Sequence, residues 1–285
     1  MRWLLQIGGR WLVSQLWRGV RGGAQSPPAG GTSAAAGEPR SQAGTKQPRP
    51  AADAVAQGCL LGVVCSSRRL FDGFSDSLLR RRTLVASQFR VASGLLEGAP
   101  VVVVLPHDTS ASMTTVLTAL IDGHHPRFVV SAGEGVSCGE QVLEGHVVVA
   151  TELVGPAGER LDLEGTSPRA EWVHRGRVAA SPNQPGEPLA IDAWSWQNAA
   201  ACRVVGVPLV ALSAITKPCP TRESPGAELL RPSTTLARRT GTFAGLAWRQ
   251  PKELKRAWQL QAAAWQACDR AVKLVSFMAK ASVGR

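Results

Sequence analysis

The sequence predicts an α/β fold over residues 58–282, in three layers, with a central mixed and mostly parallel sheet flanked by helices. Residues 193–205 are rich in alanine and favour a helix. The Gly-Val-Pro turn at 206–208 supplies the glycine that commonly ends a helix. The next run, 209–212, is apolar without alternation, as in a strand covered on both faces. A helix, a tight turn and a buried strand in succession are typical of α/β proteins.

Other segments repeat this alternation. A hairpin is expected over 84–105, with its turn at Glu97-Gly98. The expected strands of one sheet are 59–65, 101–105, 127–132, 146–152 and 207–213, and the expected helices are about 68–80, 112–121 and 251–280.

The net charge of +11 lies at the two ends of the chain. Residues 1–57 hold seven Lys and Arg against two Asp and Glu, and residues 218–285 hold twelve against four. The middle segment, 58–217, is close to neutral, with thirteen against fifteen. A near-neutral core argues against a nucleic-acid-binding groove, so we expect no nucleic-acid partner.

The cysteines are scattered and have no CxxC spacing. Most lie in apolar runs, so we expect free core residues in a reducing, cytoplasmic compartment, with neither disulfides nor a metal site. The six are Cys59, Cys65, Cys138, Cys202, Cys219 and Cys268.

The N-terminal segment divides into two parts. Residues 1–21 mix Trp and Leu with four Arg at roughly helical spacing and contain no acidic residue. This pattern fits either an unstructured start or an amphipathic helix that binds an anionic membrane surface peripherally. A transmembrane span would need about 20 consecutive apolar residues. Residues 22–57, rich in Ala, Gly, Ser and Pro, are expected to be a disordered linker.

Three motifs in a row carry a family resemblance. They are Asp192-Ala193-Trp194, Gly206-Val207-Pro208 and Ser213-Ala214-Ile215-Thr216-Lys217. Their order and spacing resemble the C-terminal core of the nucleoside phosphorylase/nucleosidase superfamily, which includes methylthioadenosine/S-adenosylhomocysteine nucleosidases. That family carries Asp-Met-Glu, Gly/Asn-Val-Pro and Arg-Ala-Ile-Ser-Asp at these places. The tail from Trp248 is similar to that of a bacterial subgroup of phosphorylase-like proteins, so the chain is interpreted as a divergent bacterial member.

The resemblance also shows where the family's chemistry is missing. Its ribose-holding Glu corresponds to Trp194, and its catalytic Asp corresponds to Lys217. The acid that follows the family's first strand corresponds to Leu70, and no carboxylate occurs there before Asp72. Replacement of all three positions implies either a strongly diverged site or an inactive one, in which case the protein is a pseudoenzyme.

Two carboxylates remain as candidate catalytic residues. Glu134 lies between Gly133 and Gly135, in a segment that resembles the family's glycine loop, where the backbone can approach a base or sugar. Glu134 is either a replacement acid or a solvated loop residue. Asp192 is the second candidate, although the resemblance gives its position a structural role at the helix opening.

The remaining candidates are ligand-binding residues. Trp194 is a candidate for stacking on a base, and Lys217 for holding a phosphate or pairing with Glu134. Thr109 and Ser110 precede the helix at 112–121, where they either simply cap it or mark a phosphate site. We expect no cofactor, and phosphate is a candidate co-substrate at this site.

Two hypotheses about function follow. The first is a nucleoside-like or glycoside ligand bound without ordinary catalysis. The alternative is an active N-glycosidase or phosphorylase with a rebuilt site that uses Glu134 as its acid. By resemblance, a homodimer is also expected.

Overall fold

The fold is described from a computed structural model, which places residues 59–86, 88–107, 113–163, 168–182, 187–217 and 251–283. The expected membrane-binding segment 1–21 and linker 22–57 lie outside these residues, as do Thr109, Ser110 and Cys219. The helices are α2 (Arg68–Ser77), α3 (Met113–His124), α4 (Ala193–Val205) and α7 (Pro251–Val283). The strands are β1 (Leu61–Cys65), β2 (Leu79–Val85), β3 (Phe89–Leu96), β4 (Ala99–Pro106), β5 (Phe128–Ser137), β6 (Val147–Val154), β7 (Arg160–Asp162), β8 (Val173–Ala179), β9 (Ala190–Ile191) and β10 (Leu209–Lys217).

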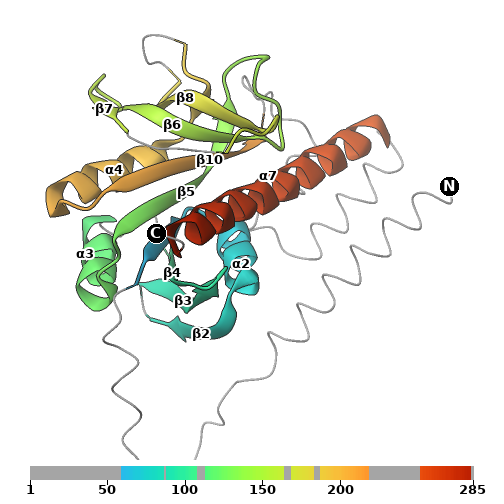
Figure 1. The fold of residues 1–285 in the computed structure, drawn as a ribbon. Helices are drawn as coiled ribbons and strands as arrows, with labels where there is room; N and C mark the ends of the chain where they lie inside the picture. Colours follow the sequence, from blue (N-terminus) through green and yellow to red (C-terminus); the bar gives the residue numbers. More distant parts are fainter. Residues whose placement is uncertain are drawn as a thin grey trace, which may run out of the picture. The chain divides into compact units, whose positions relative to one another are not determined.

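Within the described residues, all ten strands belong to one sheet (Figure 1). The five strands expected from sequence, now β1, β4, β5, β6 and β10, are all among them, which confirms that part of the prediction. Helices lie on both sides of the sheet, so the α/β class is also confirmed.

The expectation of a mostly parallel sheet needs correction, because the sheet is evenly mixed. β1 runs parallel to β4 and β5, β10 runs parallel to β5, and β8 runs parallel to β6 and β9. The pairs β2–β3, β3–β4, β5–β9, β6–β7 and β6–β10 are antiparallel. Short connections cause much of this. The turn at Glu97-Gly98, with φ of 50° and 84°, is too short for anything but an antiparallel hairpin.

The sheet closes on itself at one end. β5 pairs with β10, β10 with β6, β6 with β8, β8 with β9, and β9 again with β5. These five strands therefore form a ring. At the other end the order runs β1, β4, β3, β2, and β2 is the last strand.

Two apolar clusters cover the two faces of the sheet. On β1, Leu61, Val63 and Cys65 point into the first cluster, which α2 and α7 cover, while Val64 points into the second, covered by α3 and α4. The alternation follows from the two-residue period of a strand. Figure 1 shows α2 beside α7 on one side of the sheet and α3 and α4 on the other.

Capping residues mark boundaries of α2 and α4, whereas α3 extends to His124, beyond its expected end at 121. Ser67 caps α2 through its side chain, Asp192 caps α4, and Gly206 ends α4 with a left-handed φ of 73°. The long α7 buries a stripe made mainly of alanine, which allows close approach to the sheet. Among the described helices, none has the length and apolar character needed to cross a membrane.

Candidate ligand site at the carboxyl edge of the sheet

Three parallel strands bring the candidate residues to one edge. β1, β5 and β10 are neighbours in parallel register, with Cys65 beside Ala132 and Ser213 beside Gly133. Their carboxyl ends therefore meet at the same edge of the sheet. In α/β sheets ligands bind beyond this edge, where the loops leave the strands.

Asp192 is buried beneath this edge, at the start of α4. Its Oδ1 accepts hydrogen bonds from the backbone N–H groups of Trp194 (3.0 Å) and Ser195 (3.3 Å). Its Oδ2 contacts the hydroxyl oxygens of Ser195 at 2.7 Å and Ser213 at 2.8 Å. Burial raises the pKa of Asp192 above its ordinary value, because desolvation of the charge outweighs these hydrogen bonds. The carboxyl group therefore joins the helix start to β10.

The Asp192 carboxylate packs directly against the backbone of Gly133. A methyl group at Gly133 would overlap Oδ2 and would lie 2.6 Å from Cγ of Asp192. The neighbouring Gly135 is also tight, since a Cβ there would lie 3.1 Å from Cβ of Ser213. The glycine at 133 is thus explained by an internal carboxylate.

Glu134 points to the opposite face of the sheet. The Oγ atom of Ser66, just after β1, accepts a hydrogen bond from the Glu134 backbone N–H at 2.9 Å. The carboxylate Oε2 lies 3.6 Å from Nη1 of Arg69 on α2. Arg69 in turn lies over the ring of Trp265 on α7, 5.1 Å from its centroid. Glu134 therefore belongs to the face covered by α2 and α7.

The two candidate carboxylates do not converge. Gly133 and Glu134 are consecutive residues of β5, so they face opposite sides of the sheet. The Asp192 carboxylate fills the space on the Gly133 side, and Arg69 contacts the Glu134 side chain on the other side. A single ligand cannot receive both carboxylates without rearrangement of the strand.

The other candidates are placed as follows. Trp194 is 9% exposed and packs in the cluster under α3 and α4, with its indole N–H 3.5 Å from the carbonyl oxygen of Val64. Lys217 is exposed at the end of β10, beside Val136, after an irregularity in the strand register. Leu70 is fully buried. Only Lys217 and Glu134 of this set present a charged group toward solvent at the edge.

Sequence reasoning missed a second polar pair beneath α4. Asn198 donates from Nδ2 to Oγ of Ser131 at 2.8 Å, and both residues are fully buried. Among the described residues, no group donates a hydrogen bond to Oδ1 of Asn198. A signal was available: Ser131 and Ser213 each interrupt an otherwise apolar strand, and buried hydroxyl groups generally need partners.

Two histidines form a further pair beside β10. His146 Nδ1 lies 2.8 Å from His174 Nε2, and the ring centroids are 5.0 Å apart. Desolvation lowers the pKa of both imidazoles, and the neighbouring His174 and Arg270 lower that of His146 further. A backbone hydrogen bond of 2.9 Å from Ile215 to His146 ties this pair to β10. In the described part of the chain, no three His, Cys, Asp or Glu residues gather as metal ligands would.

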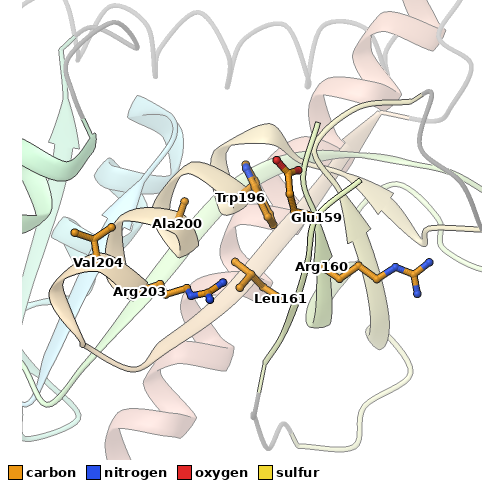
Figure 2. A pocket seen from close by; sticks show the side chains of 7 residues that line it. All are labelled: Glu159, Arg160, Leu161, Trp196, Ala200, Arg203 and Val204. Atoms are coloured by element: carbon orange, nitrogen blue, oxygen red, sulfur yellow. The ribbon is translucent and has the colours of Figure 1, made fainter. Parts of the chain in front are cut away.

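A shallow groove of about 380 Å³ lies along the outer side of α4 (Figure 2). Its walls combine apolar side chains with three charged ones. They are Glu159, Arg160, Leu161, Trp196, Ala200, Arg203 and Val204. Trp196 and Glu159 pack directly against the backbone of Gly155, since a Cβ there would overlap both side chains. The sequence analysis did not predict this groove.

Comparison with known proteins identifies the fold. No protein-family model matches the chain, and no curated protein is similar to it in sequence. The 5′-methylthioadenosine/S-adenosylhomocysteine nucleosidase from Neisseria meningitidis, solved with methylthio-immucillin-A, is 14% identical. The match covers 76% of this chain and 98% of that one, with a TM-score of 0.53.

A second solved structure agrees with the first. The corresponding nucleosidase from Helicobacter pylori, solved with butyl-thio-DADMe-Immucillin-A, is 12% identical, with a TM-score of 0.51. That match covers 77% of this chain and 98% of the other. The chain therefore has the fold of the methylthioadenosine/S-adenosylhomocysteine nucleosidases.

Proposed function

We propose that this protein binds a purine-nucleoside-like ligand at the carboxyl edge of β1, β5 and β10 and does not cleave it. The fold supports the binding half of the proposal, because similar nucleosidases have been solved with nucleoside-like ligands. The glycines at 133 and 135 and the free end of β10 at Lys217 lie at this edge. Residues 109 and 110 are further candidates for holding an anionic group.

One observation supports the non-cleaving half most strongly. The Asp192 carboxylate has both oxygens occupied inside the protein, by two backbone N–H groups and two serine hydroxyls. Cleavage of an N-glycosidic bond needs an acid for the leaving base and negative charge near the developing oxocarbenium ion. A carboxyl group that is already fully engaged as a helix cap is poorly suited to either task.

The positions that resemble the family's catalytic residues support the same conclusion. Leu70 and Trp194 are buried apolar side chains, and Lys217 is a cation. A cation beside an oxocarbenium ion would raise the energy of the transition state. The Lys217 ammonium is better suited to binding an anion, so we propose that phosphate binds against this residue.

The experiment is an assay for adenine release by the purified full-length chain. With 5′-methylthioadenosine or S-adenosylhomocysteine, with or without phosphate, release should stay at the level of a protein-free control. Calorimetric titration with adenosine should nevertheless show saturable binding. Any strengthening of this binding by phosphate should disappear in Lys217→Ala and persist in Lys273→Ala, a control at an exposed lysine of α7. Adenine release well above the control would overturn the proposal.

The alternative is an active enzyme with Glu134 as its acid. The observation that favours it is position: Glu134 lies at the same edge, its side chain is 27% exposed, and Ser66 fixes its backbone. Turnover that is present in the wild type and absent in Glu134→Gln would establish this alternative. Turnover unchanged in Glu134→Gln would show that the acid lies elsewhere.

A further inference from the structure

Strand β2 is a free edge of the sheet. It lies at the edge of the sheet and pairs with β3 alone among the described strands (Figure 1). All seven of its residues are exposed. Leu79, Leu84 and Val85 are each about two-thirds exposed, at 66%, 64% and 65%. An edge strand offers a row of unpaired backbone N–H and C=O groups, which can pair with a strand from another chain.

The start of β2 is shaped by a bulge. Leu79 pairs with Leu95 and Arg82 with Ser93, so Arg80 and Arg81 together lie opposite Gly94. Arg80 has a positive φ of 54°. A Cβ on Gly94 would lie 2.6 Å from the carbonyl oxygen of Leu79, so the glycine accommodates the bulge. Regular pairing then holds from Arg82 to Val85, which leaves a short edge of four residues.

The charge of this edge is strongly positive. Arg81 is engaged by Asp76, 2.6 Å away, and by Ser75. Arg80 and Arg82 have no ion-pair partner in the part of the chain that the structure describes. A partner strand that carries carboxylates would meet these two cations, and its apolar residues would cover Leu84 and Val85.

We propose that β2 binds an extended, acidic segment of another protein by strand addition, with the peptide backbone paired to Arg82–Val85. The charge of the edge favours this partner over a second copy of the chain and over the chain's own long segments. A second copy paired through β2 would bring three more arginines and no carboxylate to this edge, so it would leave Arg80 and Arg82 without an opposite charge. The two long segments of this chain outside the described residues are basic: residues 1–57 hold seven Lys and Arg against two Asp and Glu. Residues 218–250 hold five Arg against two Glu.

The test measures binding of fluorescent nine-residue peptides to the full-length chain. One probe contains valine, threonine and glutamate, a second has lysine in place of every glutamate, and a third is the acidic probe with an N-methylated backbone. The acidic probe should bind, and the lysine probe should not. N-methylation removes the backbone donors of the peptide without changing the protein, so it should abolish binding.

Two protein variants locate the site. Arg82→Glu should weaken the acidic probe about tenfold or more, because an attractive cross-strand pair becomes a repulsive one. Arg203→Glu makes the same charge change at an exposed residue of α4 and should alter binding less than about twofold, as a charge far from a contact is screened by salt.

Other outcomes would overturn the proposal. Equal binding of the acidic and lysine probes would remove the charge selectivity. Binding that survives N-methylation would mean that the peptide binds by charge alone, without strand addition. A nucleic acid or an anionic membrane could bind such a surface equally well. Sedimentation that shows a wild-type dimer lost in Leu84→Glu would assign the edge to a second copy.

Discussion

Asp192 and Glu134 flank the same stretch of β5 from opposite faces, and their surroundings differ in almost every physical respect. Asp192 is 3% exposed and receives four donors at the start of α4. The Glu134 side chain is 27% exposed and meets one guanidinium at 3.6 Å. One carboxyl group is part of the fold, and the other is available to solvent. Proximity to a glycine-rich strand end therefore does not by itself identify a catalytic acid.

The largest expected effect is that of Asp192→Ala. The change removes the cap of α4 and leaves the hydroxyls of Ser195 and Ser213 without their acceptor. Loss of a cap costs about 1 kcal/mol, and buried donors left unpaired cost about 1–3 kcal/mol more, so about 2–4 kcal/mol is expected in total. Urea denaturation would measure this loss. A loss below about 1 kcal/mol would contradict the structural role.

Gly133→Ala should be the next most damaging change. The new methyl group would overlap the Asp192 carboxylate, and overpacking of this kind costs about 1–3 kcal/mol. Gly139→Ala is the matched control, because a Cβ there meets nothing within 4 Å. If the carboxylate is the obstacle, Gly133→Ala should cost much less in an Asp192→Ala background. Additive costs in this double-mutant cycle would show that another group is responsible.

The pH dependence of stability should report on the burial of Asp192. The pKa of Asp192 is raised in the folded state above its ordinary value of 3.8, so the unfolded chain loses this proton at lower pH. The stability that Asp192 contributes is therefore fully present below pH 3.8 and is lost as the pH rises through the folded pKa. The difference in unfolding free energy between wild type and Asp192→Asn should fall over this window. A difference that rises with pH would mean that the folded pKa is depressed.

A smaller effect is expected at Ser66. The Ser66 hydroxyl oxygen accepts the backbone N–H of Glu134 at 2.9 Å, and this bond links the end of β1 to β5. Ser66→Ala should cost about 1 kcal/mol, the usual net contribution of a hydrogen bond. Hydrogen exchange of the Glu134 amide should become faster in the same variant. Unchanged exchange would show that this bond is not formed in solution.

The smallest effect is expected for Glu134→Gln. Its ion pair with Arg69 is partly exposed, and such pairs contribute about 0–1 kcal/mol, less at high salt. Denaturation at low and high salt would measure the difference, with Glu140→Gln as an exposed control. A loss as large as that of Asp192→Ala would make the two carboxylates equivalent and would remove the contrast between the faces.

The elements were predictable where the signal is local. The continuous apolar run of β10 and the glycine at 206 predicted a helix, a turn and a buried strand, which the structure confirms. β2 was missed, since three consecutive arginines between apolar residues resemble the end of a polar helix as much as an exposed strand. The ring was also missed, because closure depends on pairing between β5 and β9, more than fifty residues apart.

The arrangement of the site was harder to predict for a specific reason. The glycines predict that the strand ends at 132 and that Gly133 to Gly135 form a loop, in which neighbouring side chains can converge. The strand instead continues to Ser137, so strict alternation separates Glu134 from the space above Gly133. Donors to Asp192 from Ser195 and Ser213 could not be assigned before the helix and β10 were placed together.

The ring of strands has a consequence for local unfolding of the sheet. All five of its strands come from one continuous stretch of chain, residues 128–217, whereas β1 to β4 come from the stretch before it. No ring strand can detach without breaking ladders on both of its sides. The ring should therefore lose its protection against amide exchange in a single cooperative step, while β2 frays first. Two of the three strands that meet at the candidate ligand edge, β5 and β10, belong to this ring, and only β1 joins it from outside.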